Sequence, residues 1–216
     1  SNPLTFEELG QNQGIVEYTT TLIGRRSGTL SIPGLHDWAN VFVDGKHLGV
    51  LDRRAGIATI EIPASSNPRP RLTLVVEGMG HINFSSAMLD RKGIDGYVLL
   101  NGMIMTNWEM RRVDLFNGPS IPLLSSEAPK HPGAYFGGAF NLAFTADTFL
   151  DLSNWTKGYV WVNGHLLGRY WNIGPQHKLY CPAEFLKKGE NKVVVLDLVQ
   201  LEAKSISGSK LGEAAF

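Results

Sequence analysis

The sequence predicts an all-β protein built from two related antiparallel β-sandwiches. Short runs rich in Val, Ile, Thr and aromatic residues follow one another along the chain. Most of the 24 glycines among the 216 residues fall between these runs, and no long segment shows helical periodicity. Many short strands at close spacing with almost no helix are typical of antiparallel sandwiches.

Eight runs carry the strand signature, most of them five to eight residues long and either alternating or continuously apolar. In chain order, these expected strands cover residues 14–22, 39–43, 57–62, 71–76, 97–100, 148–152, 159–162 and 192–198. The best helical candidate is 183–188, one or two turns with Pro182 ahead of it and Gly189 just past its end.

A repeat at a spacing of 119 residues predicts that the sandwich occurs twice. The segment 38–49 matches 157–168, and each contains an Asp-Gly or Asn-Gly turn, a returning strand and a Gly four residues beyond the turn. Such turns favour a type I′ hairpin, so positive φ is expected at the turn glycines. The same spacing relates Gly45 to Gly164, Gly49 to Gly168 and Pro63 to Pro182, with short strands expected at 59–62 and 178–181 before the prolines.

Proline-rich residues between the two copies predict the domain boundary. The stretch 117–133 contains four prolines and breaks any regular element. The expected organisation is a first sandwich at 1–116, a linker at 117–133, a second sandwich at 134–204 and a polar tail at 205–216.

Composition excludes several classes of function. Twenty basic and 20 acidic residues give a net charge of zero, which argues against a nucleic-acid binder and a polybasic membrane anchor. The single cysteine, Cys181, excludes an intrachain disulfide and a Cys-rich zinc site. No apolar stretch reaches the roughly 18 residues of a membrane span. The start, Ser1-Asn2-Pro3, shows no signal peptide and looks like a cut fragment.

A search for catalytic chemistry gives no candidate residue. The chain has no nucleophile elbow, zinc-protease motif, P-loop or dinucleotide fingerprint, so we expect no catalytic residue, metal site or cofactor. The carboxylates, Glu77 and Asp90 among them, show no pairing across a cleft and are expected to be solvated surface charges. Aromatic residues crowd the stretch 155–171, where they either pack a core or an interdomain surface or stack on a ligand.

The string from Asn154 to Trp171, followed by Gly174-Pro175-Gln176, resembles the C-terminal hallmark of the glycoside hydrolase family 35 β-galactosidases. The resemblance extends over nearly the whole chain. Matching stretches of the family's first β-domain are 11–14 with Tyr18, 49–53, 75–80 with Asn83, 92–94, 100–102 and 106–108.

The resemblance implies what the chain does and does not contain. Enzymes of that family hydrolyse terminal β-linked galactose with retention, using two glutamates of an N-terminal (β/α)8 barrel, and nothing here matches that barrel. The chain would then be two galactose-binding-like jelly rolls without catalytic residues, which buttress the barrel and complete its active-site rim. The implied partners are the barrel and galactose-containing glycans, and the implied location is extracellular, periplasmic or lysosomal. The alternatives are an independent carbohydrate-binding module and a structural or oligomerisation module.

The resemblance also suggests site residues. The stretch after Val76 matches the segment of the first β-domain that faces the sugar pocket, so the rim or sugar-binding candidates are His81, Asn83 and Phe84. The family usually has Arg at the position of His81, and Tyr-Gly where this chain has Phe84-Ser85. An interdomain or structural role is expected for the hallmark residues Trp155, Trp161, Asn163, Gly164, Gly168, Arg169, Tyr170 and Trp171.

Overall fold

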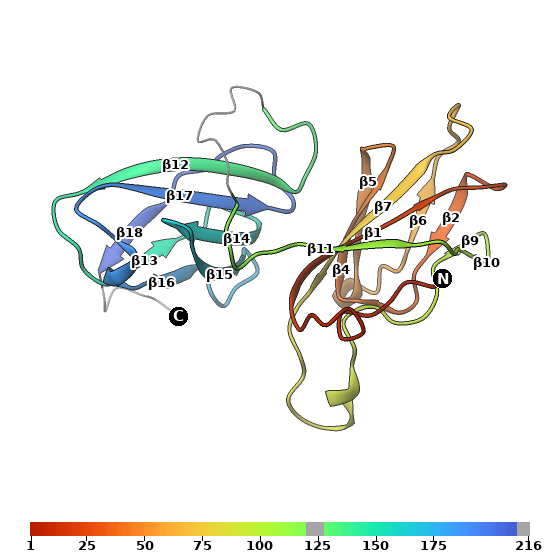
Figure 1. Cartoon of the computed structure of the whole chain (residues 1–216), viewed down its shortest axis with the longest axis horizontal. Coiled ribbons are helices and arrows are strands. Elements are labelled where there is room, and N and C mark those ends of the chain that lie inside the picture. Colours follow the sequence, from red (N-terminus) through yellow and green to blue (C-terminus); the bar gives the residue numbers. More distant parts are fainter. Residues whose placement is uncertain (120–127, 211–216) are drawn as a thin grey trace. The chain divides into compact units, whose positions relative to one another are not determined.

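The computed structural model describes residues 1–119 and 128–210, which divide into two compact units after Val113 (Figure 1). Both units are built from β-strands, and the described residues contain no α-helix. No helix in this part of the chain is long and apolar enough to cross a membrane.

The first unit is a sandwich of two antiparallel sheets. The large sheet has the order β11-β1-β7-β4-β5, the small sheet has the order β10-β9-β2-β6, and β3 pairs with β8 beside them. The strands are β1 (Gly14–Thr21), β2 (Gly28–Ser31), β3 (Leu35–His36), β4 (Trp38–Val43), β5 (Lys46–Asp52), β6 (Thr59–Ile62), β7 (Arg71–Gly78), β8 (Gly93–Ile94), β9 (Leu99–Leu100), β10 (Met103–Ile104) and β11 (Glu109–Arg112).

The second unit repeats this plan with fewer strands. Its large sheet has the order β12-β17-β14-β15 and its small sheet the order β16-β13-β18. The strands are β12 (Ala134–Leu142), β13 (Thr148–Asp151), β14 (Lys157–Val162), β15 (His165–Trp171), β16 (Lys178–Cys181), β17 (Gly189–Asp197) and β18 (Ser207–Lys210). The order β1-β7-β4-β5 thus corresponds to β12-β17-β14-β15, and β9-β2-β6 corresponds to β18-β13-β16.

The repeated hairpin has the predicted geometry in both units. The two turn residues have positive φ in each copy, +50° and +76° at Asp44 and Gly45 and +48° and +87° at Asn163 and Gly164. Positive φ at both positions is the type I′ geometry, whose twist matches that of the flanking strands. A register shift also occurs at equivalent places, between Val41 and Phe42 and between Val160 and Trp161.

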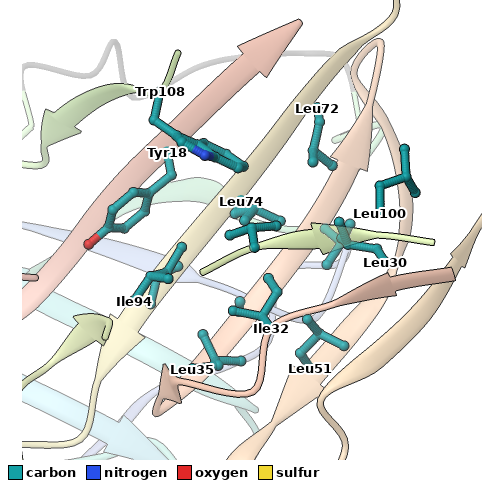
Figure 2. Packing of buried hydrophobic residues seen from close by; sticks show 14 of the residues in the cluster. Tyr18, Leu30, Ile32, Leu35, Leu51, Leu72, Leu74, Ile94, Leu100 and Trp108 are labelled. Carbon is teal, nitrogen blue, oxygen red and sulfur yellow. The ribbon is translucent and has the colours of Figure 1, made fainter. Parts of the chain in front are cut away.

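Each sandwich encloses its own apolar core. In the first unit, side chains from both sheets meet between them (Figure 2), among them Leu30 of β2, Leu51 of β5 and Leu74 of β7. The core of the second unit joins Leu150 of β13 to Val160 and Val162 of β14. Because successive side chains of a strand point to opposite faces of its sheet, one face of each sheet turns apolar side chains toward the core.

Two sequence expectations differ from the structure. The helical candidate 183–188 forms only a single 3-10 turn, η3 (Ala183–Phe185), because so short a segment cannot repay the cost of helix nucleation. The chain divides into its two compact units after Val113, which precedes the expected linker at 117–133. The expected polar tail contains β18, which pairs with β13 through backbone groups and so leaves no apolar pattern in the sequence.

Candidate functional site

The loop of residues 79–92, which joins β7 to β8, is the candidate functional site. Figure 1 shows it extending away from the strands of the first unit, with the single 3-10 turn η2 (Ser86–Leu89) near its end. Four large apolar side chains of this loop are exposed, with Phe84 77% and Leu89 87% accessible. We call these four residues the apolar tip: Ile82, Phe84, Met88 and Leu89. Four exposed apolar side chains within one loop make it a candidate interaction surface.

A cluster of buried ions holds the base of the loop. Lys92 Nζ lies 3.0 Å from Asp37 Oδ2 and 2.8 Å from Asp90 Oδ2, and these three side chains are less than 10% exposed. Arg53 reaches the same two carboxylates, at 3.0 Å from Asp37 and 2.7 Å from Asp90. Asp37 also accepts a hydrogen bond from the backbone N–H of Met79 at 2.7 Å. Both ends of the loop are therefore tied to one charge-balanced cluster.

The electrostatics of this ion cluster are set by its cations. The hydrogen bonds from Arg53 hold the pKa of the Asp90 carboxyl far below its ordinary value, with Lys92 and His36 acting in the same direction. The same carboxylate raises the pKa of the Arg53 guanidinium. Asp90 and Arg53 are thus charged at neutral pH. The buried side chains of the cluster depend on their partners, because an unpaired buried charge is costly.

The three rim candidates lie in this loop but have different surroundings. His81 Nε2 lies 2.9 Å from the backbone oxygen of Asn12 and 3.6 Å from Glu7 Oε1, so this side chain faces the N-terminal segment. Asn83 is exposed, and Phe84 belongs to the apolar tip. Ser85 follows with a φ of +71°, and its hydroxyl accepts a hydrogen bond from Ala87 N at the start of η2.

Two of the eight hallmark residues expected to have an interdomain or structural role lie in the second core. Trp155 and Tyr170 are both buried there, and the ring of Trp155 packs edge-on against Phe136 at a centroid distance of 5.3 Å. The Tyr170 hydroxyl donates to Leu196 O at 3.0 Å and to Asp197 Oδ2 at 2.9 Å. Burial and the neighbouring carboxylate raise the pKa of this phenol, so it stays protonated.

Trp161 lies on the other face of β14 and is only 1% exposed. Its indole N–H donates to the backbone oxygen of Leu115 at 2.7 Å. A segment that precedes the sandwich in sequence therefore contacts the outer face of the large sheet. Val160 and Val162, on the opposite face of β14, lie in the core of the second unit.

The other hallmark residues lie in the turn of the second hairpin and in β15. Asn163 donates to Phe185 O at 2.7 Å and accepts from Lys192 N at 2.9 Å, which joins the turn to η3 and β17. Gly164 and Gly168 have φ of +87° and +141°. The guanidinium of Arg169 lies 5.7 Å from the ring centroid of Trp171.

The described residues provide neither a group of metal-binding side chains nor a reactive thiol. No group of three or more His, Cys, Asp or Glu side chains in this part of the chain could hold a metal ion. Cys181 is buried, and its burial raises the pKa of the thiol to about 11. A thiol with that pKa is a poor nucleophile at neutral pH.

The ion cluster is the part of the site that sequence reasoning missed. Asp90 and Glu77 were expected on the surface, and that expectation is wrong: the Asp90 side chain is 9% exposed and Glu77 is fully buried. The members of the cluster come from positions 37, 53, 90 and 92, so only the folded chain brings them together. No local spacing in the sequence signals such a set.

Family models match both units. Residues 3–114 match "Beta-galactosidase, first all-beta domain", and residues 134–191 match "Beta-galactosidase, galactose-binding domain". Among solved structures, the apo form of the Pleurotus ostreatus lectin covers 87% of this chain with 11% identity and a TM-score of 0.26, a score too low to indicate a shared fold.

Curated relatives are more similar in sequence. Beta-galactosidase 17 of Arabidopsis thaliana is 33% identical over 92% of this chain and 33% of its own length. The beta-galactosidase of Xanthomonas manihotis is 36% identical over 82% of this chain and 30% of its own length. The human beta-galactosidase is 35% identical over 91% of this chain and 32% of its own length. The chain thus spans about a third of these relatives and matches only all-β domains. These matches show that the chain belongs to the β-galactosidase family.

Proposed function

We infer that the chain is the non-catalytic β-sandwich region of a β-galactosidase whose catalytic (β/α)8 barrel lies outside these residues. In this role the two sandwiches buttress the barrel, and the 79–92 loop completes the rim of its active site. The observation that carries the proposal is the combination of an apolar tip with a base fixed by buried ions.

The lengths of the relatives support a catalytic domain separate from these two sandwiches. The curated relatives carry the name beta-galactosidase and are about three times as long as the part that this chain matches. Hydrolysis of terminal β-galactosides would then take place on the barrel. We also propose, from the same family resemblance, that the complete protein is secreted or delivered to the periplasm or the lysosome.

The geometry of the loop suits a rim. A recognition loop must present side chains to a partner without losing its own shape, and rigid support for such side chains lowers the entropy cost of binding. The ion cluster fixes both ends of the loop, while the apolar tip stays exposed for contact. Phe84 would border the sugar beyond the galactose, with Asn83 maintaining the local turn, and the remaining tip residues would contact the barrel.

The experiment is Phe84→Ala in the complete enzyme, assayed on β-galactosides with and without a second sugar. A stacking ring contributes about 1 kcal/mol, which corresponds to about a fivefold loss of kcat/KM. That loss is expected only for the substrate with the second sugar.

Phe116→Ala provides the matched control, because Phe116 is also an exposed phenylalanine, 69% accessible, but lies outside the loop. This variant should leave both substrates unaffected. Equal effects of Phe84→Ala on the two substrates, or none on either, would remove Phe84 from the rim.

A further inference from the structure

The second sandwich lacks, within residues 128–210, two strands that its counterpart has. In the first unit β11 extends the large sheet beyond β1, and β10 extends the small sheet beyond β9. In the second unit β12 and β18 take the places of β1 and β9, and each is the last strand of its sheet. Among the residues that the structure describes, this side of the sandwich is therefore extended by further strands in the first unit and ends at β12 and β18 in the second.

On this side, β11 and the segment just before it cover the core of the first unit. Trp108, just before β11, is 4% exposed and belongs to the core cluster, and its indole N–H donates to Met105 O at 3.0 Å. Met105 and Met110 pack against the same core. Four residue pairs join β11 to β1, from Val16↔Arg112 to Thr19↔Glu109.

This side of the second sandwich contains an apolar cavity of about 850 Å³. Its lining includes Phe136, Phe140 and Leu142 of β12, together with Trp155, Leu186 and Val193. The buried indole N–H of Trp155 has no hydrogen-bond acceptor within the described structure. A buried donor without a partner is costly, and this residue is one of those that line the cavity.

The edge beside the cavity is not protected against pairing. β12 has the sequence AYFGGAFNL, nine residues without a charge or a proline. Proteins usually block exposed edge strands with those residues. Its alternate residues are half-buried toward the cavity, so a strand paired with β12 would place every second side chain over the opening.

We propose that a β-strand from the part of the protein outside these 216 residues pairs with β12 and closes this cavity with apolar side chains at alternate positions. The proposal rests on the proposed function, in which the chain is one section of a longer β-galactosidase. A second copy of β12 fits less well, because its own inward side chains already face its own cavity.

The first test compares amide hydrogen exchange of residues 134–142 in the complete protein and in the 216-residue chain. Pairing should slow exchange across β12 by at least about tenfold in the complete protein. β15, the opposite edge of the same sheet, is the internal control and should exchange alike in both. Equal exchange of β12 in both proteins, or equal protection of β12 and β15, would overturn the proposal.

The second test identifies the occupant. Ala139→Cys places a thiol on the exposed face of β12, whereas the native Cys181 is buried, so a thiol-directed photo-crosslinker labels the new position in the complete protein. The expected cross-link joins β12 to a segment of the same polypeptide beyond these residues, and His165→Cys on β15 should not reach that segment. A cross-link to a second copy or within the 216 residues, or no cross-link at all, overturns the proposal.

The two proposals fail separately. If the complete protein hydrolyses β-galactosides and Phe84→Ala behaves as expected, but β12 exchanges freely, only the strand pairing is wrong. If β12 is protected and cross-linked as expected, but the complete protein lacks hydrolysis, only the proposed function is wrong.

Discussion

At the scale of single residues, the ion cluster at the base of the 79–92 loop combines two carboxylates with two cations. Lys92 is the most deeply buried of the cations, with a side chain 3% exposed, and it contacts both Asp37 and Asp90. Arg53 is 40% exposed and closes the cluster from the solvent side. Removal of Lys92 would leave two neighbouring buried carboxylates with a single, partly exposed cation.

Lys92→Met should therefore destabilise the first unit by about 3–5 kcal/mol, the usual cost of leaving a buried charge without its partner. Urea unfolding of the whole chain, followed through hydrogen exchange of β1 and β7, measures this change. Lys46→Met is the matched control, because Lys46 is exposed beside the first hairpin turn, and it should shift stability by less than about 0.5 kcal/mol. Equal effects of the two variants would show that the cluster contributes nothing.

The cluster also predicts how stability depends on pH. Because the pKa of Asp90 is lower in the folded chain than in the unfolded chain, its stabilising contribution is present above the unfolded pKa, near 4. This contribution is lost as the pH falls through the folded value. The unfolding midpoint of the first unit should therefore fall on acidification below about pH 4, and it should fall less steeply in Asp90→Asn. If the unfolding midpoints of the wild-type chain and of Asp90→Asn fell equally steeply below about pH 4, Asp90 would not be the source of this pH dependence.

At the scale of elements, the repeated hairpin was predictable and the edge strands were not. An Asp-Gly or Asn-Gly pair between apolar runs specifies a turn locally, and strands β6 and β16 have the predicted bounds, 59–62 and 178–181. β12 and β18 have little signal, because the first contains two adjacent glycines and the second is Ser-Gly-Ser-Lys. Their conformation comes from backbone pairing with neighbours distant in sequence.

Two glycines of the second hairpin should respond very differently to alanine. At Gly164 the φ of +87° strains any side chain, but no atom lies within 4 Å of the added Cβ, so Gly164→Ala should cost about 1 kcal/mol. At Gly158 the Cβ would lie 1.8 Å from Leu196 O, and backbone would have to move. Gly158→Ala should cost at least about 3 kcal/mol. Thermal unfolding of both variants checks the order, and a similar loss at the two positions would contradict it.

At the scale of the whole molecule, the sequence revealed the duplication and the family resemblance but not the ion cluster. The duplication is visible because hairpin residues repeat at one spacing, and the structure gives both units the same strand order. The candidate loop could be located because it follows a strand within a recognisable stretch. Its anchoring could not be foreseen, since four charged side chains from three separate segments meet only after folding.

The chain alone should not hydrolyse β-galactosides. A retaining glycosidase needs two carboxyl groups about 5 Å apart, one of them able to donate a proton at neutral pH. Asp37 and Asp90 do lie close together, but Lys92 Nζ is 3.0 Å from one and 2.8 Å from the other, and Arg53 bridges both. The pKa of Asp90 is lowered, which is the opposite of what a general acid requires. We therefore expect a chromogenic β-galactoside to turn over at the rate seen in buffer. Saturable hydrolysis by the purified chain that disappears in Asp90→Asn would place a catalytic pair in the first sandwich and contradict the proposed function.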